Sequence, residues 1–160
     1  MTTPVRLRPL AVSDAPELTR VLADPDLYTY TGGVPPLEDE LVHRFTLLTR
    51  GGPADGSERW INDVVLTPTG EAVGYVQATV PAADGPTEIA WVIGVPWQGR
   101  GFATAAARLL LERLAGEGVA EVVADIHPDH AASNAVARAL GLHPTDEIVD
   151  GETRWAGRTG

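Results

Sequence analysis

The stretch Glu88-Ile-Ala-Trp-Val-Ile-Gly-Val-Pro-Trp-Gln-Gly-Arg-Gly-Phe-Ala103 joins an apolar segment to a loop of small residues. Residues 88–95 are mostly apolar, which predicts a buried strand. Between Gly101 and Gly116 apolar residues recur every three or four positions, which predicts a helix. A strand, a short loop and a helix therefore follow one another here.

The loop itself, Gln98-Gly-Arg-Gly-Phe-Ala103, has the composition of an anion site. Its small residues let a ligand approach the backbone, and the unpaired amides and dipole of a helix start favour a negative charge. We therefore expect a phosphate or pyrophosphate here, with Thr104 adding a hydroxyl and Arg100 a charge. The loop lacks the Gly-Lys-Ser/Thr of a Walker loop and the spacing of a dinucleotide fingerprint. A tight turn before a glycine-rich helix start is the alternative.

The segments outward from this loop predict a mixed sheet with helices on its faces, an α+β fold. The strand 88–95 and a strand over 119–126 should be parallel, with a right-handed crossover, whereas the strands 60–66 and 72–80 form an antiparallel hairpin. Further strands are predicted at 5–10 and as a pair over 144–156. Helices are predicted from 13–17 onward, over 37–49 and over 132–140. Loops are predicted at 24–36 and 51–56.

Length and composition limit the class of protein. The chain has 160 residues, 44% of them apolar, which suits one globular domain over 1–160. It has no cysteine, so disulfides, thiolate catalysis and cysteine-based zinc sites are excluded. His, Asp and Glu do not cluster with ligand spacing, so we expect no metal.

The charge pattern indicates the partners. Twelve Lys plus Arg against 22 Asp plus Glu give a net charge of −10, which repels nucleic acid and anionic membranes and attracts a cationic amine. Serving solubility alone is the other interpretation of this acidity. The N-terminus shows no apolar region of a signal peptide, and polar residues interrupt the longest apolar stretch, 102–114. We therefore expect a cytoplasmic protein.

The segment 88–103 resembles the acetyl-CoA-binding core of GNAT acetyltransferases, whose signature is Gln/Arg-x-x-Gly-x-Gly/Ala after an apolar strand. His127-Pro-Asp-His-Ala-Ala-Ser-Asn-Ala-Val-Ala-Arg-Ala-Leu-Gly-Leu142 is similar to the second motif of that family, and Arg6-Leu-Arg-Pro-Leu10 to its first strand. The resemblance spans nearly the whole chain, and it is closest to the branch that includes the ribosomal-protein N-terminal acetyltransferases.

The resemblance implies a set of acetyl-CoA-binding residues. Backbone groups of the strand before the loop hold the pantetheine arm and the acetyl carbonyl, and an amide near Ile93 stabilises the oxyanion. Gly94 suits a bulge that splays this strand from the next. His130 stands where the family usually has an Asn that contacts the cofactor arm. The implied contacts are with Trp91, Val92, Ile93, Gln98, Gly99, Arg100, Gly101, Phe102, Ala103, Thr104 and His130.

The resemblance also implies catalytic residues. Asp125 and Glu88 are the two candidates for the base, acting through water, and the apolar neighbours of Asp125 would make it a stronger base. Ser133 matches a Ser that lies near the cofactor sulfur and would donate a hydrogen bond to the leaving thiolate. Ala137 occupies the position of the Tyr acid of many relatives, which excludes a Tyr acid there. Glu88 as a surface charge, Asp125 as a structural group and Ser133 as an ordinary helix residue are the alternatives.

The resulting prediction is an N-acetyltransferase that moves an acetyl group from acetyl-CoA to a primary amine by direct attack. An acyl-CoA-binding regulatory module without turnover is one alternative, and a transferase for a longer acyl group, with room beside Ala90 and Gly94, is another. The acceptor pocket is expected from loops 24–36 and 51–58 and the C-terminal strands, with Trp60, Tyr28 and Tyr30 as lining aromatics. The acceptor itself stays open, and the branch resemblance allows a homodimer.

Overall fold

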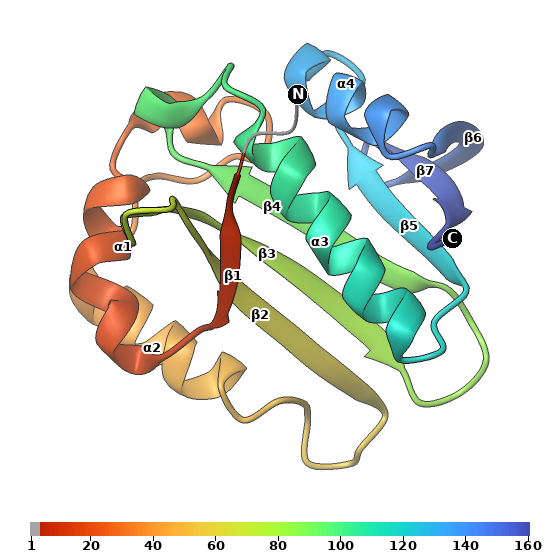
Figure 1. Ribbon diagram of the computed structural model, residues 1–160, viewed down its shortest axis with the longest axis horizontal. Helices are drawn as coiled ribbons and strands as arrows, with labels where there is room; N and C mark the ends of the chain where they lie inside the picture. The colour runs from red at the N-terminus through yellow and green to blue at the C-terminus, as the bar shows by residue number, and fades with distance from the viewer. Residues whose placement is uncertain (1–3) are drawn as a thin grey trace.

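The computed structural model describes residues 4–160, and within them the chain forms a seven-stranded sheet in the order β1-β2-β3-β4-β5-β7-β6 (Figure 1). The strands are β1 (Arg6–Pro9), β2 (Glu58–Leu66), β3 (Ala72–Pro81), β4 (Thr87–Ile93), β5 (Glu121–Ile126), β6 (His143–Val149) and β7 (Glu152–Arg158). The helices are α1 (Ala15–Val21), α2 (Glu38–Leu48), α3 (Phe102–Gly116) and α4 (Ala131–Ala139). Residues 1–3 lie outside the described part. The expected domain range and the expectation of no signal peptide both involve these residues.

The sheet is mixed, as predicted, and most of its strand pairs are antiparallel. Only β4 and β5 are parallel among its paired neighbours in residues 4–160, and α3 connects them. Every predicted helix and strand is present, with ends that differ by a few residues. The predicted loop 24–36 contains a short 3-10 helix, Pro25–Tyr28, that the sequence reasoning missed.

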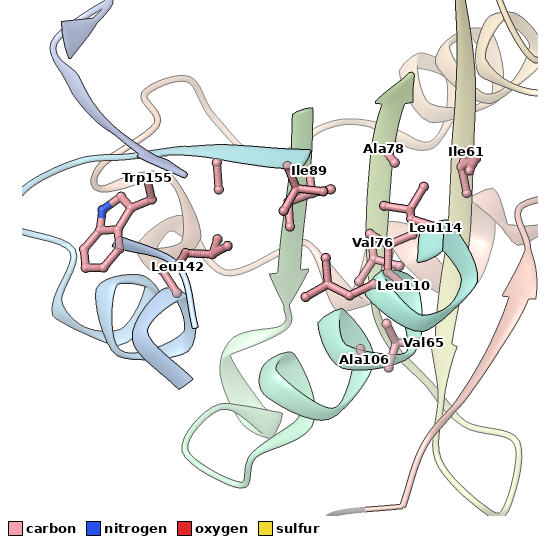
Figure 2. Packing of buried hydrophobic residues seen from close by; sticks show 14 of the residues in the cluster. Ile61, Val65, Val76, Ala78, Ile89, Ala106, Leu110, Leu114, Leu142 and Trp155 are labelled. Atoms are coloured by element: carbon pink, nitrogen blue, oxygen red, sulfur yellow. The ribbon is translucent and has the colours of Figure 1, made fainter. Parts of the chain in front are cut away.

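Helices cover both faces of the sheet. Helices α3 and α4 form one core with the sheet, and helices α1 and α2 form another. Helix α3 lies across one face in Figure 1, and Ala137 of α4 belongs to the same core cluster. Figure 2 shows Leu110 and Leu114 of α3 pointing towards Val76 and Ile89 of the sheet. On the other face, α1 and α2 bury a second cluster whose members include Leu18, Leu41 and Phe45. The three-to-four spacing of the apolar residues thus places each helix on the sheet.

The gap between β4 and β5 is the feature that positions the site. These strands pair only through Thr87 with Val122 and Glu88 with Val123, and no pairing between them follows. Strand β4 continues to Ile93 along β3, and β5 continues to Ile126 along β7. The remaining backbone of each strand on this side is therefore left without a strand partner, which confirms the predicted splay.

The predicted bulge at Gly94 was wrong. The pairing of β3 with β4 runs without a register shift as far as Gly74 opposite Ile93, and the Gly94 amide still donates to the Val73 carbonyl over 2.8 Å. A Cβ on Gly94 would lie 2.7 Å from the Val21 carbonyl oxygen and 2.8 Å from the Trp97 ring. Glycine is therefore needed here because the end of α1 packs against the backbone.

No helix formed by residues 4–160 is long and apolar enough to cross a membrane.

Candidate active site

A cavity of about 760 Å³ opens where β4 and β5 diverge. Its walls come from β4, the loop before α3, the first turns of α3 and α4, the end of β5 and the β6–β7 turn, with Leu27, Tyr30 and Thr31 closing one side. Segments that are far apart in the sequence thus meet at the splay. The predicted anion loop and both predicted base candidates lie on this one cavity.

The loop before α3 has the geometry of an anion site. Gly99 and Gly101 have positive φ values of 77° and 83°, a backbone conformation that only glycine adopts without strain. Helix α3 then begins at Phe102 and runs for 15 residues, so its first amides, through Thr104, have no carbonyl partner within the helix. Of the predicted loop residues, Gln98, Gly99, Gly101, Phe102, Ala103 and Thr104 line the cavity.

Arg100 is the predicted loop residue that does not line the cavity. The residue is exposed and is not part of the cavity wall. The two left-handed glycines on either side of it turn the neighbouring backbone towards the cavity. The loop therefore offers backbone amides rather than a guanidinium at the cavity wall.

Strand β4 presents alternate backbone groups to the splay. Because the Gly94 amide pairs with Val73 of β3, alternation along the strand turns the backbone groups of Val92 towards β3 and those of Trp91 and Ile93 towards the gap. The Ile93 carbonyl accepts a hydrogen bond from Gln98 Nε2 over 2.9 Å, which fastens the loop to the strand end. Trp91 and Ile93 amides are thus the ones that face the cavity, whereas the sequence predicted Trp91, Val92 and Ile93 together.

His130 and Ser133 adjoin each other at the start of α4. The Oγ of Ser133 lies 3.4 Å from Nε2 of His130, and both residues line the cavity. The His130 ring stacks on Tyr30, with 4.7 Å between the ring centroids. Burial, assisted by His127, lowers the pKa of His130, so its imidazole is neutral at pH 7. A neutral ring can accept or donate a hydrogen bond at this end of the cavity.

Asp125 is not the isolated carboxylate that its apolar neighbours in the sequence suggested. Its Oδ1 accepts a hydrogen bond from Arg154 Nε over 2.8 Å and its Oδ2 from Nη2 over 2.9 Å. The Asp125 side chain is only 9% exposed. The hydrogen bonds with Asp125 raise the pKa of Arg154. The pair exists because Asp125 lies opposite Arg154 in the β5–β7 register, which local sequence patterns do not reveal.

Glu88 is exposed near the start of β4 and lines the same cavity. Paired residues of neighbouring strands share a face of the sheet, and so do residues two apart along one strand. Glu88 pairs with Val123, and Val123 is two residues before Asp125 on β5. Asp125 in turn pairs with Arg154, and Arg154 is two residues after Glu152 on β7. Glu88, Asp125, Arg154 and Glu152 therefore share one face.

That charged face is opposite to α3 and α4. Ile89 and Ala124, the strand neighbours of Glu88 and Asp125, belong to the core cluster that contains α3. The cavity therefore passes through the splay, with the anion loop at the α3 side and the charged side chains at the other. Sequence reasoning missed four charged or titratable lining residues: His127, Asp150, Glu152 and Arg154. The strand pair over 144–156 was predicted, but not that Asp150 in the turn between the two strands lines the cavity.

The expected aromatic lining is only partly present. Tyr30 lines the cavity, but Tyr28 turns away and donates its hydroxyl hydrogen to the Leu22 carbonyl over 2.8 Å. Trp60 lies on β2, where its Nε1 donates to Glu58 over 2.8 Å. Loop 51–58 does not line the cavity, so the expectation that it forms part of the acceptor pocket was wrong. The C-terminal strands do line the cavity, as expected.

Residues 5–143 match the acetyltransferase (GNAT) domain family, so the chain belongs to that family. An L-2,4-diaminobutyric acid acetyltransferase from Marinococcus halophilus is 33% identical over 91 residues, which are 56% of this chain and 53% of that relative. The alignment thus spans about half the length of this curated relative.

Solved structures share the fold. A spermidine N-acetyltransferase from Vibrio cholerae, in complex with CoA and spermine, has a TM-score of 0.76 at 17% identity, covering 97% of this chain and 95% of that one. A ribosomal L7/L12 alpha-N-protein acetyltransferase in complex with coenzyme A has a TM-score of 0.77 at 18% identity, covering 98% and 95%. The two likenesses are nearly equal, so the expected closeness to the ribosomal-protein branch finds no specific support.

Within residues 4–160, no group of three or more His, Cys, Asp or Glu side chains could hold a metal ion.

Proposed function

We propose that this acetyltransferase moves the acetyl group of acetyl-CoA to a primary amine by direct attack. The observation that carries the proposal is the cavity through the β4–β5 splay, which joins an anion-binding loop to a wall of carboxylates. The loop fits the pyrophosphate of acetyl-CoA, because its left-handed glycines and unpaired helix amides suit a phosphate. The carboxylates suit a cation, the form in which an alkyl amine exists at neutral pH.

Acetyl-CoA, as a substrate, supplies the thioester. In this proposal Gly99 to Thr104 hold its pyrophosphate, and the Trp91 and Ile93 amides pair with the pantetheine arm and stabilise the oxyanion. The amine nitrogen forms a bond to the thioester carbon, the C–S bond breaks, and CoA leaves as a thiolate that takes up a proton. Ser133, beside the neutral His130, donates a hydrogen bond to that thiolate.

The amine must first lose a proton, because only the neutral form attacks. The sequence predicts Asp125 or Glu88 as the group that receives it. Both line the cavity, but the Asp125 carboxylate is held on both oxygens by Arg154. Between these two residues, the contacts favour Glu88 as a proton acceptor and Asp125 as a residue that positions Arg154.

The acceptor belongs to the class of small cationic amines. The relatives point in this direction by name, since one is a diaminobutyric acid acetyltransferase and another a spermidine N-acetyltransferase. The carboxylates on the cavity wall agree with such a charge. A protein N-terminus is the second candidate, as the name of the ribosomal relative suggests.

The test is CoA release from acetyl-CoA, detected with a thiol-reactive dye. The chain has no cysteine, so every thiol detected comes from CoA. The acceptor panel contains short diamines, polyamines, diamino acids, aminoglycosides and peptides with a free N-terminus. Accelerated release with one class supports the proposal. Binding of acetyl-CoA without release on the whole panel would contradict it and favour an acyl-CoA-binding regulatory module.

Competition between acetyl-CoA and longer acyl-CoAs tests the acyl specificity. Ala90 lines the cavity, but Gly94 does not, and its surroundings are filled by Val21 and Trp97. Only one of the two small residues that suggested a longer acyl group therefore adds room, and we propose acetyl as the group transferred. The cytoplasmic location, the homodimer and the lack of nucleic-acid or membrane partners stay predictions from the sequence.

A further inference from the structure

We propose that Glu152, which the sequence did not single out, is the catalytic base that removes the proton from the acceptor amine. The inference rests on the proposed function and names a third carboxylate at the same site. Glu152 is the first residue of β7 and comes directly after the Asp150-Gly151 turn.

The sheet register directs Glu152 to the acceptor side of the cavity. Thr153 pairs with Ile126, the last residue of β5, so Glu152 lies just beyond the end of β5 in the sheet. Being two residues from Arg154, it lies on the face that carries Arg154 and Asp125. Glu152 is half-buried and lines the cavity. Its carboxylate is thus on the face opposite to α3. In the proposed reaction the amine enters from this face, and the thioester reaches the splay from the α3 face.

The two other carboxylates on that face are less suited to accept a proton. Asp125 already accepts two hydrogen bonds from Arg154, and protonation would break that bidentate pair. Glu88 is exposed, so its carboxylate stays in contact with solvent rather than being enclosed at the cavity wall. Glu152 combines a place on the cavity wall with partial burial.

The charges around Glu152 favour the protonated carboxyl. Burial raises the pKa of Glu152, and Asp125 of β5, Asp150 of the β6–β7 turn and Glu88 of β4 raise it further. His127, which follows β5, acts in the opposite direction. Arg154 is the nearby cation on β7, and it is engaged by Asp125 and approaches Glu147 at 3.7 Å. A base is most effective when its pKa approaches the working pH, so these neighbours improve Glu152 as a base.

The protons balance in this scheme. The acceptor ammonium gives one proton to the Glu152 carboxylate, and the resulting neutral amine attacks the thioester carbon. The tetrahedral intermediate loses its second N–H proton to the departing thiolate, which leaves as the free thiol of CoA. Glu152 then releases its proton to solvent, and one proton is produced for each amide formed.

The kinetic test compares Glu152→Gln with wild type, using an amine that the panel identifies. We expect kcat/KM at neutral pH to fall by about 100-fold or more, because general bases contribute about 10²–10⁴-fold. The affinity for acetyl-CoA should not change. The wild-type profile of kcat/KM should level off above the Glu152 pKa, whereas the variant should keep rising with the free amine towards its pKa of about 10.4.

Matched variants separate this role from a structural one. Glu121→Gln removes a carboxylate that lies outside the cavity, where its side chain is 64% exposed, and should leave the profile unchanged. Glu152→Asp should keep the wild-type shape of the profile at a lower rate. If Glu88→Gln abolishes the acid limb while Glu152→Gln preserves it, the inference is wrong.

A second measurement needs no acceptor. With ¹³C-labelled Glu side chains, the carboxyl signal lost in Glu152→Gln identifies Glu152, and its pH titration gives the pKa. A midpoint above the ordinary value of about 4.3 supports the inference, and one at or below it overturns the inference. This readout is independent of turnover, so it tests the raised pKa of Glu152 separately from the proposed function, even if no amine on the panel reacts.

Discussion

The Asp125–Arg154 pair sets the charge on one wall of the cavity. Two hydrogen bonds of 2.8 and 2.9 Å hold a carboxylate that is only 9% exposed, and the guanidinium is itself 21% exposed. Such a pair is costly to break from one side, because the remaining charge stays buried without its partner. The β5–β7 register thus brings together a pair whose charges set the electrostatics of this wall of the site.

Replacing Arg154 by Met should destabilise the protein more than replacing both partners. We expect Arg154→Met to lower the free energy of unfolding by about 3 kcal/mol, the range for a buried charge left without its partner. The double variant Arg154→Met with Asp125→Leu should recover part of this loss, because no uncompensated charge remains. Urea denaturation of both single variants and the double variant measures the coupling, and strictly additive losses would contradict the argument.

Gly99 supports a prediction about the affinity for acetyl-CoA. Gly99 and Gly118 have similar positive φ values, 77° and 86°, and a Cβ on either would meet no atom within 4 Å. Gly99→Ala and Gly118→Ala therefore carry the same backbone strain, but only Gly99 lines the cavity. We expect the Kd for acetyl-CoA, measured by calorimetry, to rise about tenfold in Gly99→Ala, equivalent to about 1.4 kcal/mol. An equal rise in Gly118→Ala would exclude a role for the loop amides.

At the scale of elements, the connection from β1 to α1 depends on Asp14. Its carboxylate accepts hydrogen bonds from Arg8 Nη1 and Nη2 over 3.1 and 2.8 Å and from the Ala11 amide over 2.7 Å. Burial alone would raise the pKa of Asp14, but the hydrogen bonds from Arg8 and Ala11 outweigh it and lower the pKa. The charged form therefore stabilises the fold.

Asp14→Asn should thus be destabilising in a pH-dependent way. We expect a loss of about 2 kcal/mol in the free energy of unfolding at pH 7, the value typical of hydrogen bonds to a charged group. Because the folded-state pKa is lowered, this stability is fully present above the unfolded value of about 3.9 and disappears as the pH falls through the folded value. Urea denaturation at pH 7 and near pH 3 measures the difference. Asp84→Asn, at an exposed turn position, is the control and should show no such change.

The elements were predictable from local patterns, whereas the contacts between them were not. The four-residue spacing of Ala106, Leu110 and Leu114 is a local feature of the sequence, and all three lie on α3. The partner of Asp125 depends on the β5–β7 register, which brings residues 29 positions apart together. Strand signals likewise could not tell that Trp60 lies away from the cavity, because that follows from the strand order.

For the molecule as a whole, the splay connects two different groups of residues that lie on opposite faces of the sheet. The loop 98–103 and α3 lie on one side, and the carboxylates of Glu88, Asp125 and Glu152 lie on the other. The two substrates can therefore approach each other through the sheet from separate sides. The net charge of −10 adds a long-range attraction for a cationic acceptor, which salt would screen.

In the proposed binding mode acetyl-CoA contacts segments that come together only in the folded sheet, so it should raise the thermal stability of the whole protein. At a concentration 100 times its Kd, a ligand adds about 2.7 kcal/mol to the free energy of unfolding, which for a domain of this size raises Tm by about 5–10 °C. Differential scanning fluorimetry with increasing acetyl-CoA measures this shift. Glu152→Gln should show the wild-type shift, since the carboxylate acts on the amine, whereas Gly99→Ala should show a smaller one at equal concentration. If neither wild type nor Glu152→Gln responds, acetyl-CoA does not bind in the splay. If Glu152→Gln alone fails to respond, Glu152 serves acetyl-CoA binding rather than proton removal.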